Sequence, residues 1–245
     1  MGVENSSSNM QRYFVKEVNN ELIFLEQDIF HIKNVMRLKK GAQIEVVVLE
    51  KAYLATIKSL EPFKVEIVEP ILKETELEKD VTLFFPLTKS DKAELVIQKA
   101  SELGISRLIF FNCSRSIIKL DQEQFLKKKS RYLTIAKEAS EQCHRNKIIE
   151  IIGVIPFKDI PKYKLENNLV AYELLAGSSA SLNSALNNEK TSLSLLVGPE
   201  GGLEEKEVNY LLENGFKAVS LGRRILRCET AAIFMMSIAS FYLEK

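Results

Sequence analysis

The stretch LLVGPEGG (195–202) and, shortly after it, LGRRILRCETA (221–231) decide the fold of this chain. Each joins an apolar run to a glycine turn and then to a segment with helical periodicity. A continuous apolar run is typical of a strand that is buried on both faces, as in a parallel sheet. Open parallel sheets bind their ligands in the turns that leave the carboxyl ends of the strands. The two turns therefore predict a parallel α/β domain with a binding site beside them.

The segments around the two turns continue this alternation of strands and helices. Strands are expected at the apolar runs 81–87, 107–112, 148–154, 168–175, 192–198 and 218–222. Helices are expected where apolar residues recur every three or four positions, at 91–104, 122–143, 181–186, 204–215 and 230–245. Asp91 and Glu94 have capping-box spacing at the start of the first of these helices. The alternation predicts a parallel sheet whose strands are joined by helices.

The first part of the chain has a different pattern, made of short strands. Apolar and polar residues alternate in pieces between 42 and 70, which predicts a small β-barrel. The breaks between the pieces lie at Lys51, Glu61-Pro62 and Glu69-Pro70. A short helix is expected before the barrel, in DIFHIKNVMRLKKGAQ (28–43), with its end at Gly41. Residues 1–10 are expected to form a disordered tail and 72–80 a linker.

Composition is that of a folded protein without a membrane segment. Of 245 residues, 46% are hydrophobic and 27% are charged, an ordinary balance for a globular protein. No apolar stretch approaches the roughly 20 residues that cross a bilayer. The polar start MGVENSSSNM (1–10) lacks the apolar core of a signal peptide, so we expect a cytoplasmic protein. A formal net charge of +1 neither requires nor excludes a nucleic-acid partner.

The cysteine and histidine residues do not indicate a metal site. Cys113, Cys143 and Cys228 are odd in number and lack the paired spacing of zinc ligands. His31 and His144 are far apart in the chain and are expected to pack or to contact RNA. We therefore expect reduced cysteines and no metal.

The GPEGG turn matches neither of two familiar phosphate-binding motifs. A P-loop requires a lysine and then Ser or Thr after its last glycine, but Leu203 and Glu204 follow Gly202. A dinucleotide fingerprint requires G-x-G-x-x-G, and this turn has a different glycine spacing. The glycines remove side chains from the turn, so a ligand could bind directly to its backbone. The alternative is a tight strand-to-helix connection without a ligand.

The second turn adds a cluster of positive charge. Arg223, Arg224 and Arg227 alternate with Ile225 and Leu226 just after the expected strand. Guanidinium groups beside a ligand turn favour contact with an anion such as RNA phosphate.

These two motifs resemble the C-terminal signature of the bacterial 16S ribosomal RNA uridine-N3 methyltransferases, which are members of the SPOUT superfamily. Cys228 stands where the family has threonine, a change between small residues that is expected to leave the pocket intact. The region 156–190 matches weakly. Further blocks that resemble the family are RYF (12–14), HIKNVMRLKKG (31–41), DKAELVIQKASELGI (91–105), SRSIIKLD (114–121) and AKEASEQCHRN (136–146).

The resemblance implies a PUA-like β-barrel that binds RNA at 11–74 and, at 80–245, an α/β SPOUT methyltransferase domain with a deep trefoil knot. It also implies S-adenosylmethionine as the cofactor, a homodimer, and the 16S ribosomal RNA of the small ribosomal subunit as partner. The cofactor-binding residues that it implies are Glu173, Leu174, Val197, Gly198, Pro199, Glu200, Gly201, Gly202, Leu221, Gly222, Ile225, Leu226 and Thr230.

The implied reaction is an in-line displacement in which the uracil N3 attacks the sulfonium methyl group. Because that methyl group is already activated, the main contribution of the protein is alignment. Arg227, and after it Arg223, could stabilise the negative charge that develops on the uracil oxygens. Glu200 or Glu229 could accept the N3 proton. Alternatively, Glu200 only orders its loop and Glu229 only caps the last helix.

Basic residues elsewhere could contact RNA. The run LKKKSR (126–131) is typical of a solvated helix face, whereas HRNK (144–147) ends a helix of the α/β domain. The residues expected to bind RNA are Arg12, Arg37, Lys39, Lys40, Arg145, Lys147 and Arg224.

Two other functions remain open. A non-catalytic RNA-binding or ribosome-assembly factor would keep the fold without the activity. The complete GPEGG and ILRCETA blocks favour the enzyme, because a binding module has little need for glycines at a cofactor turn. A methyltransferase that acts on another nucleotide would share the same pocket.

Overall fold

The computed structural model describes residues 10–244 except 20, 89, 117–121 and 187–189. The tail expected at 1–10 lies, apart from Met10, outside these residues. Contacts divide the chain into two compact units, Met1–Thr75 with Ser140–Lys147, and Glu76–Ala139 with Ile148–Lys245. No helix in the described part of the chain combines the length and the apolar character that a membrane span requires.

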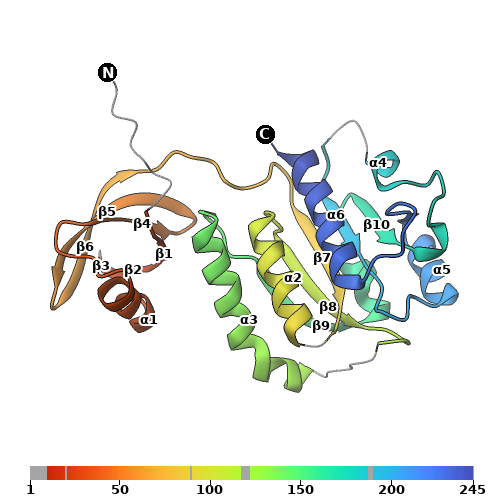
Figure 1. Cartoon of the computed structure of the whole chain (residues 1–245), viewed down its shortest axis with the longest axis horizontal. Helices are drawn as coiled ribbons and strands as arrows, with labels where there is room; N and C mark the ends of the chain where they lie inside the picture. The colour runs from red at the N-terminus through yellow and green to blue at the C-terminus, as the bar shows by residue number, and fades with distance from the viewer. Residues whose placement is uncertain (1–9, 20, 89, 117–121, 187–189, 245) are drawn as a thin grey trace. The chain divides into compact units, whose positions relative to one another are not determined.

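The second unit contains a six-stranded sheet in which all neighbouring strands are parallel. Its order is β12-β10-β11-β7-β8-β9 (Figure 1). The strands are β7 (Val81–Pro86), β8 (Arg107–Asn112), β9 (Glu150–Pro156), β10 (Asn167–Ala171), β11 (Leu193–Leu196) and β12 (Phe216–Val219). The sheet confirms the parallel α/β architecture that the alternating pattern predicted.

Helices cover both faces of this sheet. Leu83 and Phe85 of β7 pack in one cluster with residues of α2, α3 and α6, whereas Phe84 between them packs with residues of α5 and η3. In Figure 1, α2 and α6 lie side by side on one face. Burial on both faces explains why the strands are continuously apolar. The helices of the unit are α2 (Ser90–Glu102), α3 (Gln122–Gln142), α4 (Leu182–Ala185), α5 (Glu205–Glu213), α6 (Cys228–Leu243) and the 3-10 helices η3 (Phe157–Tyr163) and η4 (Glu173–Leu175).

Two of the differences from the expected boundaries in this unit concern predicted features. Helix α2 begins at Ser90, so Asp91 lies inside its first turn and is not the cap that the spacing with Glu94 predicted. The strand expected to continue through Leu175 ends at Ala171, because the chain turns into η4.

The first unit contains a four-stranded sheet of order β1-β4-β5-β6 and a separate pair, β2-β3. Strands β4, β5 and β6 form an antiparallel meander, with turns close to the breaks that the sequence predicted at Lys51 and Glu61-Pro62. Tyr13, Ile32 and Ile44 belong to its apolar core. The strands are β1 (Arg12–Phe14), β2 (Lys16–Val18), β3 (Glu21–Ile23), β4 (Gln43–Val48), β5 (Lys51–Leu60) and β6 (Phe63–Pro70).

The helix that precedes β4 is shorter than expected. Helix α1 (Glu26–Phe30) continues as the π-helix η2 (His31–Val35) and ends there. The prediction that it would end at Gly41 was wrong. Arg37 has a φ of 53°, in the left-handed region that a helix cannot continue through.

A buried ionic cluster joins β1, β4 and the segment after α3 inside the first unit. Arg12 pairs with Glu45 (Nη2 to Oε2, 2.8 Å) and donates to Oδ1 of Asn146 at 2.7 Å. The ring Nδ1 of His144 lies 2.8 Å from the same oxygen of Glu45. Arg12 and Arg145 are each only 3% exposed. Enclosed guanidinium groups cannot reach an RNA phosphate, so the expected RNA role of these two arginines is corrected to a structural one.

We predict that Arg12→Met lowers the free energy of unfolding by about 3 to 5 kcal/mol, because Glu45 would remain buried without its main cation. Lys58→Met is the matched control, since it removes an exposed pair with Glu66 in the same unit and should leave stability unchanged. Chemical denaturation followed by circular dichroism measures both variants. Equal effects would contradict a structural role for Arg12.

Candidate functional site

A cavity of about 460 Å³ opens where β10, β11 and β12 end. Its walls come from three connections: residues after β10, the GPEGG turn after β11, and residues 221–228 between β12 and α6. Small-ligand sites range from roughly 300 to 1,000 Å³. The cavity therefore lies at the sheet edge that the two glycine turns predicted and has the size of a small-molecule site.

Gly202 ends the first turn in a conformation that favours glycine. Its φ is +71°, and its N–H donates to the carbonyl oxygen of Pro199 at 2.9 Å. A Cβ at Gly202 would lie only 2.0 Å from Oε1 of Glu173, which comes from the connection after β10. Two walls of the cavity thus meet at Gly202, where a side chain would have to displace the carboxylate of Glu173.

One side chain holds the GPEGG turn itself, and another holds the start of the helix that follows it. Glu207 of α5 is 6% exposed and accepts hydrogen bonds from the N–H groups of Glu204 (2.9 Å) and Ser114 (2.8 Å). Glu204 and Glu207 form a reciprocal capping box that begins α5. Arg115 donates to the carbonyl oxygen of Gly201 at 3.1 Å. The segment after β8 is therefore fixed to the turn after β11.

The wall between β12 and α6 is joined to the connection after β10. The carbonyl oxygen of Gly222 accepts a hydrogen bond from the N–H of Gly177 at 3.0 Å. The hydroxyl of Ser220 lies 3.2 Å from both the N and the O of Gly222. These contacts hold the start of the arginine-bearing segment.

The three arginines of this wall are exposed, but they do not all face the cavity. Arg224 and Arg227 line it and Arg223 does not. In the described part of the chain, none of the three forms an ion pair with a carboxylate. Their guanidinium groups are therefore available to an external anion.

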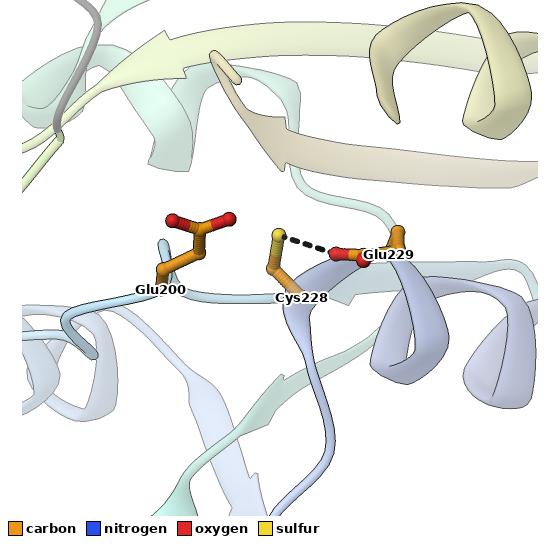
Figure 2. Close-up of side chains that lie close together, drawn as sticks. All are labelled: Glu200, Cys228 and Glu229. Carbon is orange, nitrogen blue, oxygen red and sulfur yellow. Dashed lines mark hydrogen bonds between the residues drawn. The ribbon is translucent and has the colours of Figure 1, made fainter. Parts of the chain in front are cut away.

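A thiol and two carboxylates gather beside the cavity. Figure 2 shows the sulfur of Cys228 between the side chains of Glu200 and Glu229, and the potential ligand atoms of the three residues lie within 4.8 Å of one another. The thiol donates to Oε2 of Glu229 at 3.2 Å. Burial, and next this hydrogen bond, raise the pKa of Cys228 to about 12, so the thiol is protonated at neutral pH.

Lys92 of α2 supplies the positive charge of this cluster. Its ammonium group pairs with Glu200 and, at 3.2 Å, with Oε2 of Glu229. The hydrogen bond with Glu200 is the main cause that raises the pKa of Lys92, which therefore stays charged. Burial alone would raise the pKa of Glu229, but hydrogen bonds from its own backbone N–H, from Cys228 and from Lys92 lower it. Sequence reasoning missed Lys92, because its place in α2 does not distinguish it from other polar helix residues.

Comparison with known proteins identifies the family. A model described as an RNA methyltransferase domain matches residues 75–240, and one described as an RNA methyltransferase PUA domain matches residues 25–69. The Ribosomal RNA small subunit methyltransferase E of Bacillus subtilis is 34% identical over 96% of this chain and 98% of its own length. The protein of the same name from Aquifex aeolicus is 32% identical, over 92% of this chain and 96% of its own. This chain belongs to the small subunit methyltransferase E family.

A solved structure of a methyltransferase E supports the same assignment. The protein from Neisseria gonorrhoeae, bound to S-adenosyl methionine, has a TM-score of 0.82 and 26% identity, and the match covers 94% of this chain and 96% of that one. The two family models occur in the order that the sequence predicted, a PUA domain followed by a methyltransferase domain.

Most of the residues expected to bind the cofactor line the cavity. Leu174 and Thr230 do not: Leu174 in η4 is 77% exposed and Thr230 is an exposed residue of α6. The weak sequence match at 156–190 could not show that the chain turns away after Glu173. Lining residues that were not expected to bind the cofactor are Ala171, Tyr172, Ala176, Arg224, Arg227, Cys228 and Ala231.

The expected catalytic and RNA-binding residues are distributed differently. Arg227 and Glu200 line the cavity, whereas Arg223 and Glu229 do not. Glu229 lies in the first turn of α6 and accepts a hydrogen bond from the thiol of Cys228, which does line the cavity. Of the residues expected to bind RNA, Arg224 lies at the cavity, and those exposed on the first unit are Arg37, Lys39, Lys40 and Lys147.

We predict that Cys228 resists alkylation in the folded protein. A pKa of about 12 leaves a thiolate fraction on the order of one in ten thousand at pH 8. Iodoacetamide at pH 8 should therefore modify Cys143, which is less buried, much faster than Cys228. Mass spectrometry of the cysteine peptides measures both rates. In denaturant the two rates should become similar, and fast modification of Cys228 in the folded state would contradict the prediction.

Proposed function

We propose that this protein is an S-adenosylmethionine-dependent methyltransferase that acts on N3 of a uridine in the 16S ribosomal RNA of the small subunit. The observation that carries the proposal is the cavity formed by the two glycine turns, in a chain that matches an RNA methyltransferase family model over residues 75–240. The same-family protein from Neisseria gonorrhoeae, bound to S-adenosyl methionine, supports the choice of cofactor.

The cavity fits that cofactor in size and chemistry. Apolar side chains such as Val197, Leu221 and Leu226 offer a surface for a flat base, and the carboxylate of Glu173 offers an acceptor for hydroxyl or ammonium groups. The backbone of the GPEGG turn is open to the cavity at Gly201 and Gly202. Glycine is favoured at 202 because φ there is +71°, and a side chain would in addition displace the carboxylate of Glu173.

The cofactor supplies a methyl group that its sulfonium already activates, so the residues of the protein mainly position and stabilise. Arg227 lines the cavity and carries an unpaired guanidinium among the described residues, which suits it to stabilise negative charge on the uracil oxygens. Arg224 lies on the same segment and suits an RNA phosphate.

The two candidate bases differ in what already binds them. Glu229 accepts hydrogen bonds from Cys228 and Lys92, and its lowered pKa makes it a poor proton acceptor. Glu200 lines the cavity and is 42% exposed at its side chain, although Lys92 also binds it. We therefore retain Glu200 as the candidate base and assign Glu229 a structural role.

The proposal includes a homodimer, a cytoplasmic location and a mechanism without a metal. Phe241 of α6 is 86% exposed and Phe234 is 40% exposed, and exposed aromatic side chains favour a partner surface. RNA would contact the exposed basic residues of the first unit, for example Lys39 and Lys40.

The trefoil knot stays a prediction from the family resemblance. A non-catalytic RNA-binding factor is the alternative, and cofactor binding separates the two.

We predict that Gly202→Val abolishes binding of S-adenosylmethionine, because the new side chain would collide with Glu173 and strain the turn. Gly215→Ala is the matched control: its φ is +88°, but it does not line the cavity. It should lose some stability and keep its affinity. Isothermal titration calorimetry without RNA measures both, and normal binding by Gly202→Val would place the cofactor elsewhere.

We predict that Arg227→Ala keeps cofactor affinity within about threefold but lowers the methylation rate by about 100-fold or more, the loss typical of a group that stabilises transition-state charge. Arg223→Ala, at a position that does not line the cavity, should have a smaller effect. Single-turnover methylation of purified small subunits, with mapping of the modified base, measures the rate and tests the uridine N3 assignment. An equal loss of methylation rate in the two variants would contradict a specific role for Arg227.

A further inference from the structure

The cluster beside the cavity brings together groups that would repel one another without a cation. Glu200 belongs to the GPEGG turn, whereas Cys228 and Glu229 begin α6 (Figure 2). Their oxygen and sulfur atoms lie within 4.8 Å of one another. Two carboxylates at this distance cannot both stay ionised at low cost unless a positive charge lies between them.

Lys92 provides that charge from a third element. It lies in the first turn of α2, the helix after β7, and its ammonium group reaches both carboxylates. The three side chains are shielded to different degrees: Lys92 is 21% exposed, Glu229 is 13% exposed and Glu200 is 42% exposed. Solvent and salt therefore screen the pair with Glu229 less than the pair with the exposed Glu200.

The positive charge that these two carboxylates require comes from the chain itself. Lys92 already binds both carboxylates. The ammonium group therefore does what a bound cation would do here.

We infer that Lys92 is a positioning residue, whose ammonium group ties the GPEGG turn to the first turn of α6 and so fixes two walls of the cofactor cavity. Lys92 does not itself line the cavity, whereas Glu200 and Cys228 do. It therefore acts through Glu200 and Glu229 and does not touch the ligand. The inference rests on the proposed function for the identity of the ligand, S-adenosylmethionine.

The test is the pH dependence of cofactor binding in Lys92→Met. Without the ammonium, the two negative charges repel, and one carboxylate of the compact site has a pKa above its ordinary value. At low pH, the site in which Glu200 and Glu229 lie close together takes up a proton. As the pH rises it loses this proton and becomes less stable than an arrangement in which the two carboxylates separate. Titration calorimetry between pH 4 and pH 8 should give a Kd ratio, variant over wild type, that is near one at about pH 4, below the ordinary carboxylate pKa, and on the order of tenfold at pH 8.

Two matched variants separate charge from packing. Lys92→Arg keeps the cation and should show a small ratio without a pH trend. Lys99→Met removes a lysine of the same helix that pairs with Glu102 (Nζ to Oε2, 2.8 Å) away from the cavity, and its ratio should be one at every pH. A ratio for Lys92→Met that does not change with pH overturns the inference, whether that ratio is one or larger.

The melting temperature, measured without ligand, tests the role of Lys92 independently of the proposed function. The raised carboxylate pKa gives Lys92→Met a stability contribution that is present at low pH and lost as the pH rises, so its melting temperature should fall relative to wild type between pH 5 and pH 8. If the wild type does not bind S-adenosylmethionine, the proposed function fails, and this series still decides the role of Lys92.

The double variant Lys92→Met/Glu229→Gln guards against a single variant that does not fold. It removes the excess negative charge together with the cation, so it should fold and show no pH trend in either binding or melting temperature. A pH trend that persists in the double variant would overturn the assignment of the repulsion to Glu200 and Glu229.

Discussion

The parallel pairing of β10 with β11 on one side and β12 on the other is the constraint on which the site depends. Val170 is in register with Leu196 of β11 and with Ala218 of β12. The three strands therefore end at nearly the same level, and the connections that follow them leave from one edge of the sheet (Figure 1). Buried strands on both faces fix this register, because a slip of one residue would exchange the residues that face each layer.

The connections alone would not define a cavity, since glycine-rich turns are intrinsically mobile. Each is held by a residue that is distant in sequence. Arg115 fixes the GPEGG turn to the segment after β8, Gly177 binds the wall at Gly222, and Lys92 links Glu200 to Glu229. These bonds give the turns the order that a cofactor site needs before its ligand arrives, which reduces the entropy lost on binding.

Local chemistry explains how much of this was predictable. The apolar runs of the strands and the glycines of both turns are local signals, so the sheet and the edge that carries the cavity followed from the sequence. The role of Lys92 depends on contacts between residues that are distant in sequence. The same is true of the pairing of Arg12 with Glu45 and Asn146. Such contacts produce no periodic pattern in the sequence. Leu174 was expected at the site only from the family resemblance, in the weakly matching region 156–190, and the chain turns into η4 there.

The charges around the cavity fall into two groups with different consequences. Those in the cluster beside it neutralise one another only in part, since the single ammonium group of Lys92 pairs with both Glu200 and Glu229 and the thiol of Cys228 keeps its proton. Arg224 and Arg227 line the cavity, are exposed and pair with no described carboxylate. The pocket therefore has net negative charge beside one wall and positive charge along another, and the positive wall favours contact with an anionic polymer. That division of charge matches an enzyme with two substrates better than a module that only binds RNA.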